Sequence, residues 1–187
     1  MVEQLKNWDR ELFVYLNSLG IEDYDAFWIF VTQIKHWVPL FILFFILYFL
    51  AFHWKKAAFT IVSLVASFAT TLAFTNFTKA AVARLRPNNV TDLADVIRIL
   101  QTPDNYSFFS GHASSSFVVT TFLVLTLREK YKWIYIMYLW PILFIMSRIY
   151  VGVHYPGDIV VGAFVGTIID FLFYKSYQQF LIRYFGE

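Results

Sequence analysis

Three short clusters of polar residues interrupt an otherwise apolar chain, and the first of them is cationic. Lys79 and Arg86 stand seven positions apart, with Pro87 directly after them. If the helix continued through this stretch, the two cations would lie two turns apart on nearly the same face. No carboxylate stands nearby in the sequence, so the pair suggests an anion held between the two side chains. The alternative is two interfacial residues that reach lipid headgroups.

The second cluster, Ser110-Gly111-His112, comes directly before an apolar segment. Ser110 suits the N-cap position of a helix, and Gly111 lets a ligand approach the backbone closely. The free N–H groups of a first helical turn, together with the positive end of the helix dipole, form a phosphate site. His112 would then sit at the rim as a proton donor. The alternative is an ordinary capped helix with an interfacial histidine.

The third cluster runs from Ser147 to Asp158 and adds a third cation, Arg148. Asp158 follows His154 by four residues, which is close enough for its carboxylate to bond one imidazole nitrogen. Such a bond would fix the tautomer of His154 and leave its other nitrogen free as a nucleophile. The alternative is a polar turn in which Asp158 caps the following helix.

The three clusters together hold what phosphoryl transfer needs, which is mainly positioning and electrostatic stabilisation of the phosphate oxygens. The sequence offers three cations, helix-end amides near Gly111, a nucleophile and an acid. The Asp, Glu and His residues show no convincing metal-ligand spacing. We therefore expect neither a metal nor another cofactor, because the cations can do the work that a metal would otherwise do. Arg84 and Arg98 either guide a phosphorylated substrate or lie solvated among headgroups.

The elements that position these clusters must be membrane helices. The chain has 187 residues, of which 59% are hydrophobic and 15% charged, whereas a soluble domain usually carries about 25% charged residues. The net charge of +2 is too small to suggest a nucleic-acid partner. The absence of cysteine excludes disulfides, thiolate metal sites and cysteine nucleophiles. The length predicts one domain over residues 1–187.

A bilayer core of about 30 Å needs roughly 20 apolar residues of helix. Five segments qualify, and together they predict an all-α integral membrane protein with a bundle of about five to six transmembrane helices. Their expected ranges are 37–52 (or from about residue 26), 57–78, 113–127, 133–151 and 159–174. Before them, apolar residues recur at spacings of three and four among charged ones, which predicts an N-terminal amphipathic helix in the membrane interface. These apolar residues are Leu5, Trp8, Leu12, Leu16 and Leu19.

The orientation follows from the Lys and Arg residues of the short connections. Basic residues gather at 53–56, at 128–132 and in the C-terminal tail. Five spans put these three segments on one side, which the rule makes cytoplasmic. All three polar clusters then face outward, and residues 79–158 would form one pocket. We expect an inner membrane of a bacterium, with membrane lipids around the chain and no obligatory protein partner.

The clusters resemble the three-part signature of the type 2 phosphatidic acid phosphatase (PAP2) family, particularly its small bacterial members. Lys79, Arg86 and Pro87 match Lys-x6-Arg-Pro. Ser110, Gly111 and His112 match Pro-Ser-Gly-His, in which Phe109 replaces the usual proline. The third part, Ser-Arg-x5-His-x3-Asp, is matched by Ser147, Arg148, His154 and Asp158. All three parts occur in the family's order. The substitution at Phe109 is expected to alter the shape of the rim and to leave the chemistry intact.

The resemblance implies a lipid phosphate or pyrophosphate phosphatase that works through a phosphohistidine. It assigns His154 as nucleophile, His112 as acid and then base, and Asp158 as the partner of His154. It assigns phosphate binding to Lys79, Arg86, Ser110, Gly111 and Arg148. Among bacterial substrates, undecaprenyl pyrophosphate is favoured over phosphatidylglycerophosphate, phosphatidic acid and lipid A phosphates. The remaining alternatives are a vanadate-dependent peroxidase and a non-catalytic lipid-binding protein.

Overall fold

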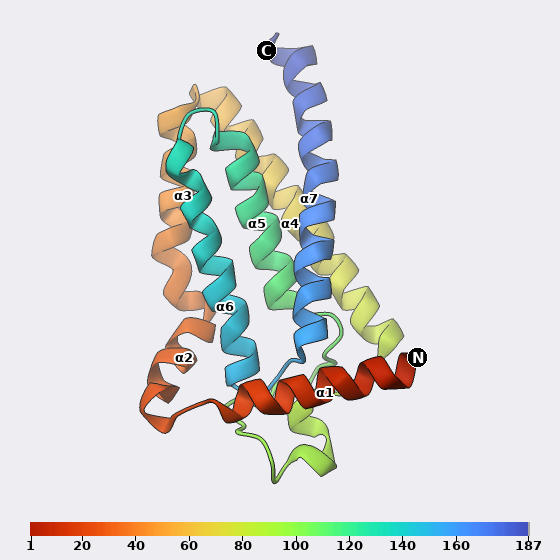
Figure 1. Cartoon of the computed structure of the whole chain (residues 1–187). Coiled ribbons are helices and arrows are strands. Elements are labelled where there is room, and N and C mark those ends of the chain that lie inside the picture. Colours follow the sequence, from red (N-terminus) through yellow and green to blue (C-terminus); the bar gives the residue numbers. More distant parts are fainter. Residues whose placement is uncertain (187) are drawn as a thin grey trace.

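The computed structural model of the protein is a bundle of helices with the N-terminal helix laid across one end (Figure 1). The structure describes residues 1–186. Five short 3-10 turns, η1 to η5, join or extend the helices. The α-helices are α1 (Val2–Ser18), α2 (Asp25–Thr32), α3 (Val38–Ala51), α4 (Trp54–Val82), α5 (Gly111–Leu127), α6 (Leu139–Tyr150) and α7 (Pro156–Phe185).

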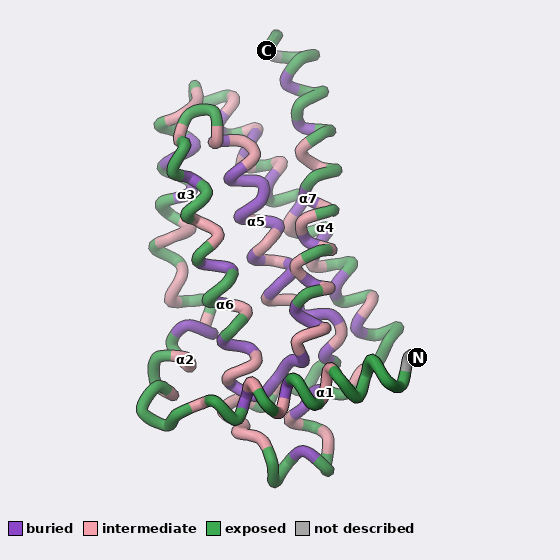
Figure 2. Tube along the Cα trace, viewed as in Figure 1, coloured by how far each residue is buried: buried purple, intermediate pink, exposed green. Residues whose placement is uncertain are grey.

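Four helical segments of the described chain are long and apolar enough to cross a membrane, namely Ile34–Ala51, Trp54–Leu93, Lys132–Tyr150 and Pro156–Tyr184. The third expected span, which corresponds to α5, is a shorter apolar helix of 17 residues in the middle of the bundle. Buried residues concentrate on α5 and on the inward faces of its neighbours (Figure 2). The all-α membrane bundle predicted from the sequence is confirmed.

The helix ends differ from the predicted ranges. The first span begins at Ile34, so the alternative start near residue 26 is wrong. The backbone is extended at Gln33, which separates α2 from the span. Helices α4 and α7 run past the predicted limits of 57–78 and 159–174, over 29 and 30 residues. Hydropathy marks only the part of a helix that lies in hydrocarbon, whereas the backbone hydrogen bonds continue into polar flanks.

The end of α4 corrects the expected geometry of the first polar cluster. The helix ends at Val82, and Ala83 takes a left-handed conformation with φ 50° and ψ 34°. Arg86 then lies in extended backbone before Pro87. Lys79 and Arg86 therefore do not share one helix face. A turn of the chain, and not the helical repeat, brings Arg86 back to the site.

Helices α5 and α7 pack closely through small residues. A Cβ atom added at Gly162 would lie 2.6 Å from the carbonyl oxygen of Ser110, and one added at Gly166 would lie 2.3 Å from that of Ser114. Both pairs are spaced by four residues, so one helix presents its small residues to the other, as in membrane helix pairs of this type. This contact sets the start of α5, with Gly111 and His112, beside the start of α7, with Asp158.

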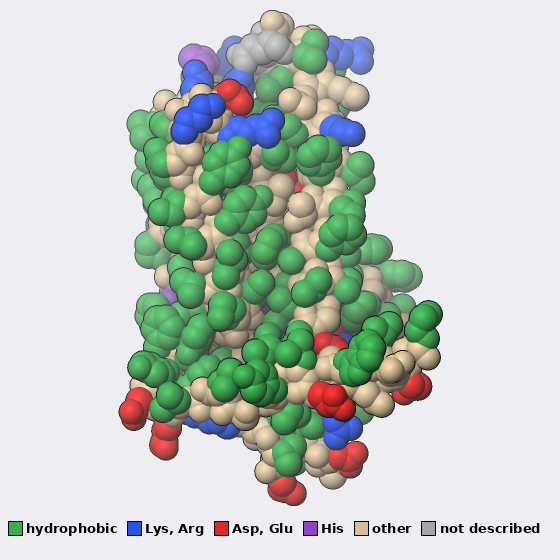
Figure 3. All heavy atoms as spheres, in the orientation of Figure 1, with side chains coloured by type: hydrophobic (Ala, Val, Ile, Leu, Met, Phe, Trp, Pro, Cys, Tyr) green, Lys and Arg blue, Asp and Glu red, His purple; other side chains and the backbone are tan. Residues whose placement is uncertain are grey.

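Helix α1 lies across the end of the bundle at which the three polar clusters meet. Its apolar stripe is mostly exposed, as a helix embedded in the membrane interface requires. The other end of the bundle holds the α3–α4 turn, the α5–η5 turn and the C-terminus. Lys and Arg side chains gather at that end, and Asp and Glu side chains gather at the end with α1 (Figure 3).

Candidate functional site

A cavity of about 610 Å³ opens among α3, α4, α5 and α6. Six of the eight residues predicted for the site line it, and they come from all three sequence clusters. These six are Lys79, Arg86, Gly111, His112, Arg148 and His154. The other two, Ser110 and Asp158, are fully buried behind the lining.

The first two cations hold oxygen atoms of the 105–107 segment. Lys79, at the end of α4, donates from Nζ to the carbonyl oxygens of Tyr106 and Ser107. Arg86 donates from Nε to the carbonyl oxygen of Asn105 at 2.7 Å and from Nη2 to Oδ1 of the same residue at 2.6 Å. The loop between α4 and α5 therefore folds over the two cations and fixes their direction.

The third cation, Arg148, comes from the last turn of α6. Its Nη1 donates to the hydroxyl of Thr32 and to Oε1 of Gln101, the latter at 3.0 Å. Its Nε is buried and has no hydrogen-bond partner within the described residues. A buried donor without an acceptor costs about 1–3 kcal/mol, so an oxygen atom that reached this N–H would stabilise the site.

The charge around the cavity is strongly positive. Lys79, Arg86 and Arg148 are each at most 6% exposed. Every acceptor that the described structure gives them is a neutral carbonyl, amide or hydroxyl oxygen, or the imidazole of His154. Burial of a charge costs several kcal/mol unless an opposite charge compensates. Three such cations around one space therefore favour the entry of a multiply charged anion, such as a phosphate ester.

His154 is held between a cation and a carboxylate. Arg86 lies with Nη1 2.9 Å from Nε2 of His154, and Asp158 lies with Oδ2 3.3 Å from Nδ1. A guanidinium group can only donate, so Nε2 accepts and its lone pair points at Arg86, which lines the cavity together with His154. The proton then sits on Nδ1 and is donated to Asp158. Asp158 also accepts from the backbone N–H of Tyr155 at 3.2 Å, so the residue caps α7 as well as orienting His154.

The surroundings of His154 keep its imidazole neutral. Burial lowers the pKa of His154 well below the ordinary value of 6.5, because the charged form loses its hydration. The positive charges of Arg86, Arg148, Lys79 and Arg84 lower it further, in that order. A neutral imidazole with an unprotonated Nε2 is the form that a nucleophile requires.

The start of α5 supplies the second imidazole. Ser110 is the N-cap, and its hydroxyl accepts from the backbone N–H of Ala113 at 3.3 Å, as predicted. The hydroxyl does not line the cavity in the described structure, whereas Gly111 and His112 do. The ring of His112 lies 4.8 Å from that of Phe144, which holds the imidazole at the wall. Helix start, glycine and imidazole thus face the same space as the three cations.

The cavity continues from the polar end into the bundle. Lys79 and Leu64 both line it, and they stand fifteen residues apart on α4, or about 22 Å at a rise of roughly 1.5 Å per residue. Phe45 and Val65 line the cavity and are also exposed on the outer surface. The apolar part therefore reaches the lipid-facing side of α3 and α4. Its other apolar lining residues are Ile34, Phe41, Phe44, Phe68, Leu72, Val119, Trp140 and Phe144.

Several contacts of the site were not predicted. Thr32, Gln101 and Asn105 hold the cations, and each stands in a stretch whose sequence carries no distinctive spacing. The sequence left Arg84 and Arg98 either to guide a substrate or to lie solvated among headgroups, and the structure places both in ion pairs. Arg84 contacts Asp9 and Asp158, each at 2.8 Å, and Arg98 contacts Asp25 at 2.6 Å. No sequence signal marked Asp9 as facing the protein, because it stands among the charged residues of the amphipathic helix.

The titratable side chains do not cluster as metal ligands do. Within residues 1–186, no three His, Asp or Glu side chains are grouped closely enough to hold an ion. The groups around the cavity are instead cations and imidazoles, whose chemistry suits a phosphate.

Comparison with known proteins agrees with this geometry. Residues 60–182 match the model of the PAP2 superfamily. The chain is 34% identical over 184 residues to a lipid A 4'-phosphatase of Bacteroides thetaiotaomicron, a match that covers 93% of this chain and 79% of that protein. It is 30% identical over 174 residues to an undecaprenyl-diphosphatase of Sulfolobus acidocaldarius, over 91% of this chain and 79% of that one.

Two solved structures share the fold. One is the transmembrane PAP2 type phosphatidylglycerolphosphate phosphatase from Bacillus subtilis, with a TM-score of 0.76 at 19% identity, over 97% of this chain and 89% of that one. The other is LpxE of Aquifex aeolicus, with a TM-score of 0.65 at 28% identity, over 88% and 93%. The resemblance found in the sequence is thereby confirmed: the chain belongs to the PAP2 superfamily and is an integral membrane phosphatase.

Proposed function

We propose that this phosphatase removes a phosphate group from a lipid A-type glycolipid at the extracytoplasmic face of the membrane, through a phosphohistidine. One observation carries the proposal. The cavity joins a cationic end, where His112 and His154 both line the wall, to an apolar channel that reaches the lipid-facing surface. A lipid phosphate has an anionic headgroup that matches the cationic end and an apolar tail that matches the channel.

In the first step, Nε2 of His154 attacks phosphorus and the P–O bond to the lipid breaks. His112 gives its proton to the leaving oxygen, which departs as a hydroxyl group. Lys79, Arg86, Arg148 and the amides at the start of α5 stabilise the charge on the equatorial phosphate oxygens. The bond from Nδ1 of His154 to Asp158 stabilises the positive charge that develops on the imidazole.

In the second step, water attacks the phosphohistidine. His112, now neutral, takes a proton from that water, and the P–N bond breaks to release inorganic phosphate. His154 returns to its neutral form with Nε2 free, and His112 is protonated again for the next cycle. No oxidant, reductant or second substrate other than water is required.

The choice of lipid rests on the relatives. The predicted preference for undecaprenyl pyrophosphate is less well supported than a lipid A phosphate, because the lipid A 4'-phosphatase is more similar to this chain. Undecaprenyl pyrophosphate remains the second candidate, since the undecaprenyl-diphosphatase is also 30% identical over most of the chain. Both substrates place a phosphate at the membrane surface and their tails in hydrocarbon.

The side of the membrane follows from the charges of the connections. The end of the bundle opposite to the cationic end of the cavity carries basic residues in and beside the two short connections, namely Lys55, Lys56, Arg128, Lys130 and Lys132. Short segments rich in Lys and Arg favour the cytoplasmic side. The cationic end of the cavity would then open outward.

The test is phosphate release by purified protein in detergent micelles, measured with lipid A, undecaprenyl pyrophosphate, phosphatidic acid and phosphatidylglycerophosphate. The expected result is the highest kcat/KM with lipid A and no release by His154→Gln protein. Glycerol 3-phosphate, which has no apolar tail, serves as the matched control substrate. Equal kcat/KM for this ester and the lipids would overturn the lipid assignment. Bromination that requires added vanadate, without phosphatase turnover, would favour the peroxidase alternative.

A further inference from the structure

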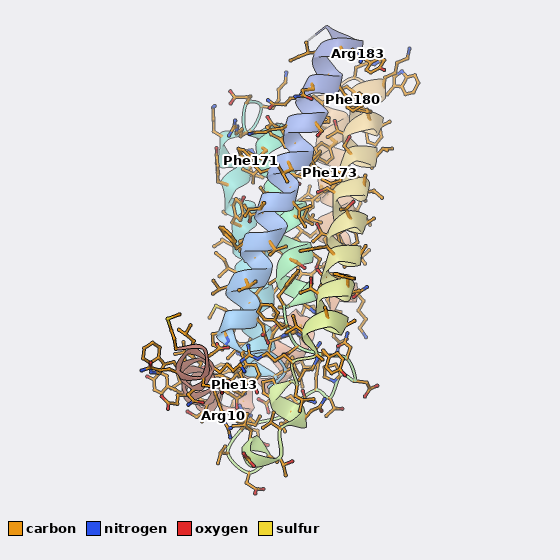
Figure 4. The ribbon with its side chains drawn as sticks, turned by 90° about the vertical axis from the view of Figure 1, so that its right-hand side faces the viewer. Arg10, Phe13, Phe171, Phe173, Phe180 and Arg183 are labelled. Atoms are coloured by element: carbon orange, nitrogen blue, oxygen red, sulfur yellow. The ribbon has the colours of Figure 1, made fainter. Side chains whose placement is uncertain are left out.

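Helix α1 has two faces of different character. Its stripe of Leu5, Trp8, Leu12 and Leu19 is exposed. Three other residues at spacings of four, Asp9, Phe13 and Asn17, face the bundle. Figure 4 views α1 along its axis and shows Phe13 on the side of the helix that faces the bundle. The face of α1 with Asp9, Phe13 and Asn17 thus packs on the protein, and the face with the apolar stripe is open to lipid.

Three residues attach the protein-facing side of α1 to the bundle. Phe13 is fully buried, with its ring 5.4 Å from that of Tyr155. Asn17 donates from Nδ2 to the carbonyl oxygens of Arg98, Ile149 and Tyr150. Asp9 is the third anchor, and unlike the other two it carries a charge into the neighbourhood of the site.

Arg84 connects Asp9 to Asp158. It donates from Nη2 to Oδ2 of Asp9 and from Nη1 to Oδ1 of Asp158, both at 2.8 Å. Its guanidinium group stacks 3.9 Å above the ring of Tyr155. The second oxygen of Asp9 accepts from the backbone N–H of Gly157 at 2.7 Å. Asp9 therefore holds both Arg84 and the first turn of α7.

These contacts give the two oxygen atoms of the Asp158 carboxylate different partners. Oδ1 is held by Arg84, whereas Oδ2 faces Nδ1 of His154 and the N–H of Tyr155. With Oδ1 fixed, the carboxylate cannot rotate and Oδ2 stays aimed at the imidazole. Loss of the Arg84 contact would free this rotation, and loss of Asp9 would free Arg84.

We infer that Asp9 and Arg84 are positioning residues for the His154–Asp158 pair, so that the interfacial helix α1 is part of the active-site framework. The inference rests on the proposed function, which gives His154 and Asp158 their roles. Neither Asp9 nor Arg84 lines the cavity in the described structure, so both act through Asp158 and not on the substrate.

The first experiment compares Asp9→Asn with Arg10→Gln. Asparagine keeps the size of Asp9 and an acceptor for Gly157, but loses the charge that holds Arg84. We expect kcat to fall about 10- to 100-fold, as for a lost charge-assisted bond, with KM near that of the unmodified protein. Arg10 is the neighbouring residue on α1, and its contact with Asp92 is a long one of 3.8 Å between exposed side chains. Arg10→Gln is expected to leave kcat unchanged.

The second experiment reads the pH profile of kcat/KM, which a merely structural contact would not move. Arg84 is one of the cations that lower the pKa of His154. Arg84→Gln should move the acidic limb to higher pH, because the imidazole gains a proton more easily. Arg84→Lys keeps the charge, so the limb should stay in place while kcat falls. The groups that act on His154 from the surrounding elements are Lys79, Arg84, Arg86, His112, Arg148 and Asp158.

The outcomes separate this inference from the proposed function. If Asp9→Asn and Arg84→Gln lower only the unfolding midpoint, with kcat and the acidic limb unchanged, the pair merely seats α1 and the inference is overturned. His154→Gln is assayed beside them. Phosphate release by that variant would refute the proposed mechanism itself, whereas its inactivity beside unaffected Asp9 and Arg84 variants would refute only the positioning role.

Discussion

Arg86 donates a hydrogen bond to His154, with Nη1 2.9 Å from Nε2. The cation that we propose to bind phosphate and the nitrogen that we propose to attack phosphorus are therefore in direct contact. The bond keeps the Nε2 lone pair directed at the guanidinium group and the proton on Nδ1, next to Asp158. An entering phosphate oxygen can take over the guanidinium group and release the lone pair for attack.

The imidazole of His154 should be indispensable. His154→Gln keeps a polar side chain of similar size but cannot form the phosphohistidine, so kcat should fall by at least about a thousandfold, as for other nucleophiles. The measurement is release of inorganic phosphate by the purified variant. His53→Gln, at an exposed histidine next to α4, is the control and should keep full activity. Normal turnover by the His154 variant would rule out this nucleophile.

Orthovanadate should inhibit in competition with the lipid, because it can adopt the geometry of the phosphoryl group in transfer. Arg148→Lys keeps the positive charge but loses the planar group, whose buried Nε has no hydrogen-bond partner within the described residues. The inhibition constant should rise about tenfold or more, as for loss of one charge-assisted bond. Arg128→Lys, at a partly exposed arginine after α5, is the matched control. An unchanged inhibition constant for Arg148→Lys would place vanadate elsewhere.

The acidic limb of the kcat/KM profile should lie below pH 6.5. Burial and the neighbouring cations lower the pKa of His154 below that value. Because attack needs the neutral imidazole, activity persists as the pH falls and is lost only when the lowered pKa is reached. The profile is measured at constant ionic strength, after the protein is shown to remain folded at each pH. A limb at or above pH 6.5 would contradict this environment for His154.

Gly111→Ala should reduce activity without loss of stability. A Cβ at this position would meet only the Cγ2 atom of Thr75 at 3.6 Å, an ordinary contact. The methyl group would, however, stand in the cavity where phosphate approaches the start of α5. We expect kcat/KM to fall about tenfold or more, which is equivalent to about 1.4 kcal/mol, with an unchanged unfolding midpoint. Full activity would show that the phosphate does not approach Gly111 closely.

Gly166→Ala, unlike Gly111→Ala, should lower the stability of the protein. Its Cβ would lie 2.3 Å from the carbonyl oxygen of Ser114, so α5 and α7 must move apart. Such overpacking costs about 1–3 kcal/mol, and the thermal unfolding midpoint should fall by several degrees. Gly111→Ala serves as the comparison, because it adds the same methyl group without the clash. An unchanged midpoint for Gly166→Ala would mean that the two helices are not in such close contact.

The residues that meet at the site were predicted from the sequence more accurately than the ends of the helices. His154 and Asp158 are close in the sequence, so their spacing of four residues was sufficient to predict their contact. The relation of Lys79 to Arg86 was predicted from a continuous helix and was wrong, because Ala83 turns the chain in a left-handed conformation. A single alanine gives no sign of such a turn, whereas a glycine would have.

The amino-acid sequence by itself determined the membrane bundle, the amphipathic first helix and the three clusters of chemical groups, because hydropathy and short spacings are properties of neighbouring residues. Only the tertiary structure decided that Thr32, Gln101 and Asn105 hold the cations. It alone also decided that Asp9 reaches Asp158 through Arg84. Asp9 and Asp158 stand 149 positions apart in the chain. No local pattern records such a pairing, because it arises only where α1 and α7 pack together.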